Sequence, residues 1–178
     1  MQVSKFLLIG LLLLSCRQRH DQEIMNTFDS INEELISAHA SLVKRESMEI
    51  DSFTRTKNWT MITTGSGLRY ELVEHGNGKK SSAADSLVYT YRANFMDGQV
   101  AISISADRPL RIMTGRGIEV RGLEEALLLM REGDKARLVL PAHLGYGSEG
   151  KGDTIPPGTV LNYEVKLLHV ISPEKKQH

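Results

Sequence analysis

The chain has 178 residues, of which 40% are apolar and 25% charged, a composition that is ordinary for a globular protein with one domain and extensions. Its 22 basic and 22 acidic residues leave a formal net charge of +0, so no excess of one sign would attract nucleic acid or an anionic membrane surface. These values argue against a disordered chain and against a nucleic-acid-binding function.

The first sixteen residues, MQVSKFLLIGLLLLSC, have the pattern of an export signal. Lys5 precedes an apolar run at 6–14, and these nine residues are too few for a membrane-spanning helix, which needs about 20. The run is typical of the apolar core of a signal peptide. We therefore expect residues 1–15 to be a signal peptide that is removed on export.

Cys16 is the only cysteine, so no intramolecular disulfide can form. The letters LLSC at 13–16 resemble the bacterial lipobox, in which cleavage precedes the cysteine and both the thiol and the new N-terminus carry acyl chains such as palmitate. This resemblance implies lipid attachment at Cys16 and a location at the bacterial cell envelope, on the periplasmic side of the membrane, with the outer membrane favoured and the inner membrane as the alternative. The alternative is a secretory signal followed by an incidental cysteine.

After the signal, apolar residues recur at alternating steps of four and three, which predicts an amphipathic helix over 24–42. The stripe consists of Ile24, Phe28, Ile31, Leu35, Ala38 and Leu42. A helix this short is not stable alone in water, so the stripe has to pack on its own domain or on a second copy of the chain in a homodimer. Ile50 and Phe53 mark a second short helical segment, and we expect residues 16–58 to be a helical extension and linker.

From Trp59 onward the pattern changes to short alternating segments divided by turns, which predicts an antiparallel sheet. The expected strands lie at 59–64, 67–76, 85–95, 99–103, 109–114, 135–141 and 159–171. One helix is expected at 123–130, with acidic residues in its first turn and Gly133 after its end. This combination predicts an α+β domain, which we place at 59–172, followed by a short tail at 173–178.

Residues 145–152, GYGSEGKG, fit G-x-G-x-x-G and nearly fit the P-loop pattern. A phosphate loop has to lead into a helix whose free N–H groups face the anion. Here Pro156 and Pro157 follow and prevent such a helix. We therefore expect no nucleotide site, and interpret the stretch as a loop beside a binding pocket.

The second half of the chain resembles the FKBP-type peptidyl-prolyl isomerases. The segments VRGLEEALLLMREGDKARLVLP, GYG, IPPGT and LNYEVKLL follow one another in the family's order, and YTYRANFMDG and RPLRIMTG extend the match over about 67–171. The resemblance implies a curved antiparallel sheet wrapped around one short helix, with a shallow apolar pocket between them. With its lipobox and helical arm, the chain is similar to envelope lipoproteins of this family associated with gliding bacteria.

Carried over by position, the resemblance also implies the site. Four residues are expected to be catalytic: Tyr91, Tyr146, Ile155 and Tyr163. Four more are expected to bind substrate: Ala101, Ile102, Val120 and Leu123. A tyrosine suits such a site because its ring is apolar while its hydroxyl can donate to a peptide carbonyl. The implied function is isomerisation of X-Pro bonds in exported proteins, assisting their folding.

Two departures from the family bear on activity. Ala101 and Ile102 stand where the family usually has Phe-Asp, so an aromatic wall and a buried carboxylate are missing, and Leu123 stands where a tryptophan is frequent. Loss of one polar partner is worth about 1–3 kcal/mol, which slows a reaction roughly ten- to a hundredfold. These changes favour a weakened isomerase, and the alternative is a membrane-tethered binding module or holdase chaperone.

Other chemistries have no candidate residues. The six histidines have no cysteine or carboxylate at metal-ligand spacing, and no G-x-S-x-G motif is present. Isomerisation itself needs neither a nucleophile nor a metal. We therefore expect no cofactor and no metal, and as partners we expect proline-containing polypeptides, a membrane reached through Cys16, and a second copy of the chain.

Overall fold

The structure, a computed structural model, describes residues 3–173, with side chains described at residue 25 and from residue 29 to residue 173. The chain forms two compact units, Met1–Arg45 and Glu46–His178. The side chains of Cys16, Ile24 and Phe28 lie outside the described residues, as does the tail from residue 174 onward. Among the described residues, no helix is both long and apolar enough to span a membrane.

The N-terminal helix α1 runs without interruption over Val3–Thr56. The sequence predicted two separate helical segments, but the junction between them, SLVKRESME, contains neither proline nor glycine, so nothing interrupts the backbone hydrogen bonds there. The helix ends at Thr56, and Asn58 follows with a φ of 54°, in the left-handed region that asparagine tolerates after a helix C-terminus. The N–H of Trp59 bonds to the carbonyl of Thr54 and closes this last turn.

The last turns of α1 belong to the second unit and pack on its sheet. Ile50 is fully buried. The buried guanidinium of Arg69 donates to Ser47 Oγ at 2.6 Å and forms an ion pair with Asp51 at 2.9 Å. The buried Ile50 side chain and the polar contacts of Arg69 therefore fix this segment of the helix to the domain.

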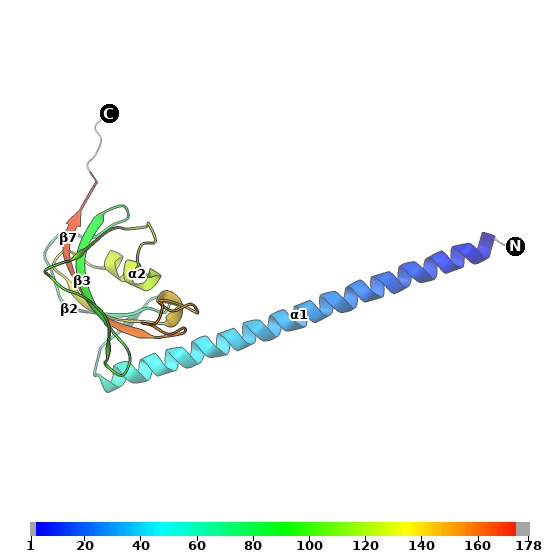
Figure 1. The fold of residues 1–178 in the computed structure, drawn as a ribbon, viewed down its shortest axis with the longest axis horizontal. Coiled ribbons are helices and arrows are strands. Elements are labelled where there is room, and N and C mark those ends of the chain that lie inside the picture. The colour runs from blue at the N-terminus through cyan, green and yellow to red at the C-terminus, as the bar shows by residue number, and fades with distance from the viewer. Residues whose placement is uncertain (1–2, 174–178) are drawn as a thin grey trace, which may run out of the picture. The chain divides into compact units, whose positions relative to one another are not determined.

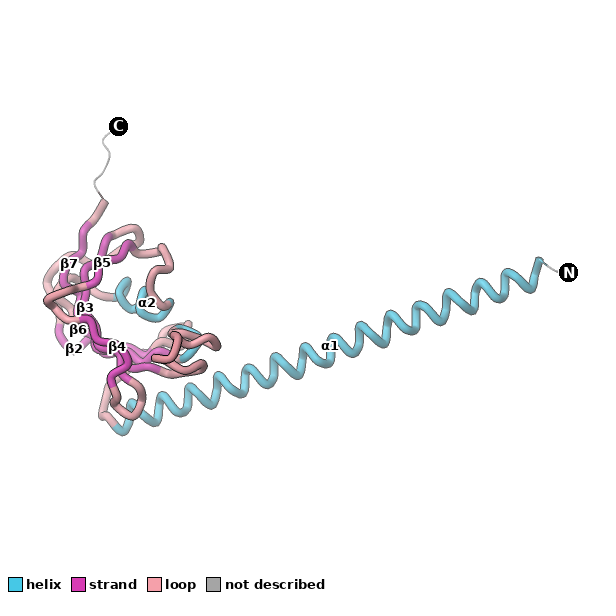
Figure 2. Tube along the Cα trace, viewed as in Figure 1, coloured by secondary structure: helices cyan, strands magenta, loops and turns pink. Residues whose placement is uncertain are grey.

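Seven strands form one antiparallel sheet. They are β1 (Ile62–Thr63), β2 (Arg69–Glu74), β3 (Ser86–Asn94), β4 (Val100–Ile104), β5 (Leu110–Met113), β6 (Lys135–Leu140) and β7 (Leu161–Ile171). Their order is β1-β2-β6-β7-β3-β4, and β5 pairs with the first half of β3 (Figures 1 and 2). All seven predicted strands are present, although the first is reduced from 59–64 to two residues.

The helix α2 (Arg121–Leu129) lies within the curve of the sheet, close to the predicted position (Figure 1). Its buried face carries Gly122, Leu123, Ala126 and Leu127. A Cβ atom at Gly122 would lie 2.7 Å from Leu140 Cγ, so glycine allows the helix to approach β6 closely. The predicted α+β fold, with a curved antiparallel sheet around one short helix and a helix before it, is confirmed.

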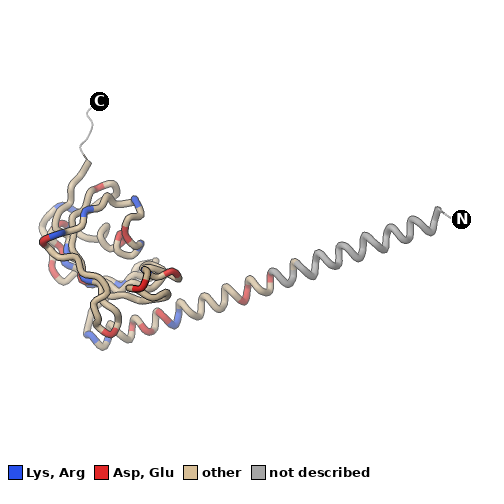
Figure 3. Tube along the Cα trace, in the orientation of Figure 1, with Lys and Arg blue, Asp and Glu red and all other residues tan. Residues whose placement is uncertain are grey.

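Strand alternation places the core on the α2 side of the sheet. Along β3 the buried residues are Leu87, Tyr89, Tyr91 and Ala93, and along β7 they are Leu161, Tyr163, Val165 and Leu167. Successive strand residues point to opposite faces, so each of these sets lies on one face. Basic and acidic residues are interspersed along the domain, as expected from the balanced composition (Figure 3).

The C-terminal end of β7 is fastened by Asp85, which is 2% exposed. Its carboxylate accepts hydrogen bonds from Ser172 Oγ at 2.7 Å, Lys79 Nζ at 3.0 Å and the Ser82 N–H at 3.0 Å. Burial alone would raise the pKa of Asp85, but these bonds favour the ionised form and lower it to about 2. The carboxylate is therefore charged throughout the neutral range.

Candidate active site

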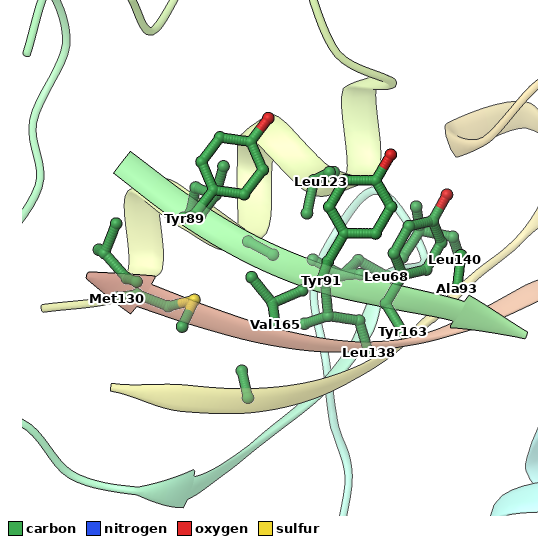
Figure 4. Packing of buried hydrophobic residues seen from close by; sticks show 14 of the residues in the cluster. Leu68, Tyr89, Tyr91, Ala93, Leu123, Met130, Leu138, Leu140, Tyr163 and Val165 are labelled. Atoms are coloured by element: carbon green, nitrogen blue, oxygen red, sulfur yellow. The ribbon is translucent and has the colours of Figure 1, made fainter. Parts of the chain in front are cut away.

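Three tyrosines, Tyr89, Tyr91 and Tyr163, form a row on the α2 side of the sheet, which we call the phenol row. Tyr89 and Tyr91 are two residues apart on β3, and their rings stack with centroids 6.2 Å apart. Tyr163 on β7 pairs with Ala93, and its ring centroid lies 5.4 Å from that of Tyr91. The three hydroxyl groups point to the same side, away from the sheet (Figure 4).

All eight predicted site residues belong to the hydrophobic core of the domain or pack against it. Tyr91, Leu123, Ile155 and Tyr163 are buried in it, and Ala101, Ile102, Val120 and Tyr146 pack against it partly exposed. They come from β3, β4, the start of α2, the 145–158 loop and β7. The rings of Tyr91 and Tyr163 lie with centroids 5.4 Å apart, and Tyr146 is near enough to raise the pKa of both.

The loop over 145–158 carries Tyr146 and Ile155 to the hydrophobic core. It is closed by backbone hydrogen bonds, from the Lys151 N–H to the Ile155 carbonyl at 2.8 Å and from the Gly158 N–H to the Gly147 carbonyl at 2.8 Å. Lys151 Nζ lies 3.4 Å from the Tyr146 hydroxyl and 5.2 Å from its ring centroid. The loop returns to β7 through turns and bridges, the path expected for a pocket wall and not for a phosphate loop.

The hydroxyl of Tyr163 is buried and makes no hydrogen bond of standard geometry among the described residues. Burial first, then the neighbouring Tyr146, Tyr91 and Glu119, and last a weak hydrogen bond with Tyr146 raise the pKa of Tyr163 above its ordinary value. Burial also raises the pKa of Tyr91, with the charge of Glu119 as the second cause. These phenols therefore stay protonated at neutral pH, and the hydroxyl hydrogen of Tyr163 lies near Tyr146 without a hydrogen bond of standard geometry.

On the β4 side the site is apolar, as the sequence predicts. Ile102 pairs with Ala93, and Ala93 pairs in turn with Tyr163, so the three residues lie side by side across β4, β3 and β7. Directly paired residues share a face of the sheet. Position 102 therefore lies on the face of the phenol row, where it presents an uncharged side chain.

Two residues beside the predicted site were missed by the sequence reasoning. Tyr89 donates its hydroxyl hydrogen to Glu119 Oε1 at 2.7 Å. The two-residue spacing of Tyr89 and Tyr91 on one strand was a signal that could have identified Tyr89. The sequence held no such signal for Glu119, because its position depends on the path of the loop before α2.

A groove of about 370 Å³ lies elsewhere on the domain and contains none of the eight predicted residues. Its lining residues are Glu49, Ile50, Phe95, Met96, Asp97, Gly158, Thr159 and Val160. Among the described residues, no group of three His, Cys, Asp or Glu side chains could hold a metal ion. The phenol row and its apolar surroundings form the candidate active site, because they combine apolar walls with buried hydroxyl groups.

Comparison with known proteins agrees with this geometry. Residues 77–168 match the family model described as FKBP-type peptidyl-prolyl cis-trans isomerase. The chain is 30% identical over 165 residues to a probable FKBP-type peptidyl-prolyl cis-trans isomerase of Haemophilus influenzae, covering 89% of this chain and 68% of that protein. It is 31% identical over 166 residues to the macrophage infectivity potentiator of Trypanosoma cruzi, covering 93% and 81% respectively.

The fold is also similar to solved structures. A crystal structure of a peptidyl-prolyl cis-trans isomerase from Pseudomonas syringae superposes with a TM-score of 0.61 at 27% sequence identity. The similarity covers 74% of this chain and 95% of that one. The curved sheet and the helix within it are therefore shared with a protein whose fold was determined by experiment.

Proposed function

The chain belongs to the family of FKBP-type peptidyl-prolyl cis-trans isomerases, and from this premise we propose that it isomerises X-Pro bonds of exported proteins at the cell envelope, where it assists their folding. The lipobox-like LLSC sequence supports a lipid anchor at Cys16. The observation that carries the site is the buried Tyr163 hydroxyl, which makes no hydrogen bond of standard geometry among the described residues and belongs to the same apolar core as Leu123 and Ile155.

The chemistry follows from the electronic structure of the peptide bond. Partial double-bond character gives rotation a barrier of about 18–20 kcal/mol, and the uncatalysed X-Pro bond takes tens to hundreds of seconds to isomerise. The twisted transition state has lost the resonance and part of the polarity of the planar amide. An apolar site that removes the amide from water, with hydroxyl donors such as those of Tyr146 and Tyr163, therefore binds the twisted form better than the planar one.

The required stabilisation is modest. Lowering the barrier by about 4 kcal/mol accelerates the rotation roughly a thousandfold. One hydroxyl hydrogen bond contributes about 0.5–1.5 kcal/mol, so two such bonds with desolvation are of the right size. The site needs only to enclose and orient the bond, since no covalent bond forms or breaks.

An isomerase assay separates catalysis from the alternative of a binding module. We expect the full chain to accelerate isomerisation of short X-Pro peptides, and Tyr146→Phe to lower kcat/KM about threefold to tenfold because one donor is lost. If the wild type gives no rate above background but slows aggregation of a denatured client, the holdase function favoured by the apolar Ala101 and Ile102 replaces the enzymatic one. Thermal unfolding of both variants checks that the fold is retained.

The lipid anchor is tested separately from the activity. Cells expressing the wild-type chain should incorporate labelled palmitate into the protein, and Cys16→Ser should abolish the label because no other cysteine is present. Membrane fractionation should place the wild type with the envelope membranes and the variant in the soluble fraction. Equal labelling of both proteins would exclude Cys16 as the attachment site.

We further propose that two copies of the chain associate through the apolar stripe of the helix over 24–42. Its described residues Ile31, Leu35 and Leu42 are 50%, 63% and 51% exposed, which leaves an apolar seam open to a partner helix with the same spacing. Leu35→Glu should convert a dimer to a monomer in analytical ultracentrifugation. Ile36→Glu is the matched control, because Ile36 is also 63% exposed but lies off the stripe.

A further inference from the structure

The carboxylate of Glu119 lies at one end of the phenol row, and nothing in the family comparison assigns it a role. Its Oε1 accepts the hydrogen bond from Tyr89 at 2.7 Å. The loop that carries it is fixed in turn by Glu124 in the first turn of α2, whose Oε1 accepts the N–H groups of Ile118 at 3.1 Å and Glu119 at 3.4 Å. The charge therefore has a defined position.

This charge acts on all three tyrosines of the row. After burial, a hydrogen bond and the charge of Glu119 raise the pKa of Tyr89, and the same charge is the second cause of the raised pKa of Tyr91. It also contributes to the raised pKa of Tyr163, after burial and the neighbouring tyrosines. Glu119 is therefore the carboxylate that the three phenols have in common.

The carboxylate of Glu119 has no ion-pair partner in the described part of the chain. Among the described residues, no lysine, arginine or histidine forms an ion pair with its carboxylate within 4.0 Å. The cation in contact with the site, Lys151, lies on Tyr146, and Ala101 and Ile102 on β4 carry no charge. The Tyr89 end of the site therefore carries a carboxylate that no ion pair neutralises among the described residues.

We propose that Glu119 sets the charge preference of the isomerase site, so that X-Pro segments with lysine or arginine flanking the proline are turned over faster than those with aspartate or glutamate. The inference rests on the proposed isomerase function and specifies its substrate class. A partly desolvated charge within reach of a flanking side chain changes binding by roughly threefold to tenfold, and bulk salt weakens the effect. Basic segments of unfolded chains are then the preferred clients.

The test compares three peptides that differ only in the residues flanking the proline, which are lysine, glutamine or glutamate. Exchange NMR with the full chain gives kcat/KM without a coupling protease whose own preference would interfere. We expect the ratio of the lysine peptide to the glutamate peptide to be about three to ten for the wild type at low salt. It should fall towards one as sodium chloride rises from about 0.05 to about 0.5 M.

Two variants assign the preference to Glu119. Glu119→Gln should bring the ratio of kcat/KM for the lysine and glutamate peptides close to one. The control Glu164→Gln should leave this ratio unchanged, because Glu164 is next to Tyr163 in sequence but is exposed on the opposite face of β7. Ile102→Asp in the Glu119→Gln background returns a carboxylate to the phenol face and should restore the preference for lysine. A merely structural role of Glu119 predicts no such rescue.

The inference is overturned if the wild type shows no preference at low salt, or if Glu119→Gln retains it. Should the variant fail to fold, the wild-type ratio and its salt dependence still decide. Peptide dissociation constants from NMR titration are measured in parallel. Absence of accelerated exchange for every peptide would refute isomerisation itself, while the charge preference could still be read from the dissociation constants.

Discussion

Tyr163→Phe and Tyr89→Phe remove the same atom from two buried tyrosines of one cluster, and the structure predicts opposite effects on stability. Tyr163 is 1% exposed and its hydroxyl makes no hydrogen bond of standard geometry among the described residues, so removing that hydroxyl also removes a desolvation cost. Tyr89 is fully buried and its hydroxyl is bonded to the carboxylate of Glu119 at 2.7 Å. Removing this hydroxyl breaks a bond to a charged group.

The magnitudes follow from these contacts. A buried polar group without a partner costs about 1–3 kcal/mol, of which nearby relaxation recovers a part, so Tyr163→Phe should raise the free energy of unfolding by about 1 kcal/mol. A hydrogen bond to a charged group is worth about 1.5–3 kcal/mol. Because Glu119 is partly exposed and can bind water after the change, we expect Tyr89→Phe to lower the free energy of unfolding by about 1–2 kcal/mol.

Urea unfolding of the wild type and both variants measures the difference, provided that the m-value is unchanged. Activity should move independently of stability. If the hydroxyl of Tyr163 serves the substrate, Tyr163→Phe lowers kcat/KM about tenfold although the protein is more stable, which corresponds to a loss of about 1.4 kcal/mol in the transition state. A destabilised Tyr163→Phe protein would refute the reasoning, because it would mean that the hydroxyl is satisfied in the folded chain. A fully active Tyr163→Phe protein would also refute the reasoning, because the Tyr163 hydroxyl would then have no role in catalysis.

Three further predictions concern the scaffold. The folded pKa of Asp85, about 2, lies below its ordinary value of 3.8, so its charge stabilises the fold above about pH 4 and this contribution, at most about 2 kcal/mol, is lost as the pH falls towards 2. Asp85→Asn should therefore flatten the pH dependence of urea unfolding between about pH 5 and 2. An unchanged slope would contradict the stabilising role of the Asp85 hydrogen bonds. Gly150→Ala would place a Cβ 2.3 Å from the carbonyl oxygen of Ile155 at a φ of +70°. We therefore expect the free energy of unfolding to fall by about 1–3 kcal/mol and kcat/KM to be reduced. The control Gly65→Ala, whose Cβ would have no atom within 4 Å, should change the free energy of unfolding by less than about 0.5 kcal/mol. Leu123→Ala empties a fully buried position and should cost about 2–5 kcal/mol in thermal or urea unfolding, and a smaller loss would show that α2 moves to fill the space.

The secondary structure of the domain was predictable from local patterns. Alternating apolar residues in β3 and β7 and the Asp97-Gly98 turn between β3 and β4 each report on their own segment, because the side-chain period of a strand is two. The full length of helix α1 was harder to predict from the sequence. Its continuity depends on the absence of a helix breaker over a polar stretch where the apolar pattern fades, and periodicity gives no signal there.

The eight predicted site residues came from family resemblance, and in the tertiary structure they join the hydrophobic core, or pack against it, from five parts of the chain. The resemblance could not supply Glu119, because this chain carries its carboxylate at a position that the family pattern does not mark. Nor could it show that the hydroxyl of Tyr163 makes no hydrogen bond of standard geometry among the described residues. Both facts depend on which side chains the folded loops place beside the phenol row.

The sequence by itself determined the strands, the helix α2 and the family, since these follow from periodicity, turn chemistry and ordered motifs along the chain. Only the tertiary structure decided the polar contacts, such as Tyr89 with Glu119 across 30 positions and Asp85 with Ser172 across 87. The physical reason is the distance along the chain over which each kind of interaction acts. Backbone propensity acts over a few neighbouring residues, whereas the partner of a buried polar group is fixed by strand register and loop path, which exist only after the whole sheet has closed around α2.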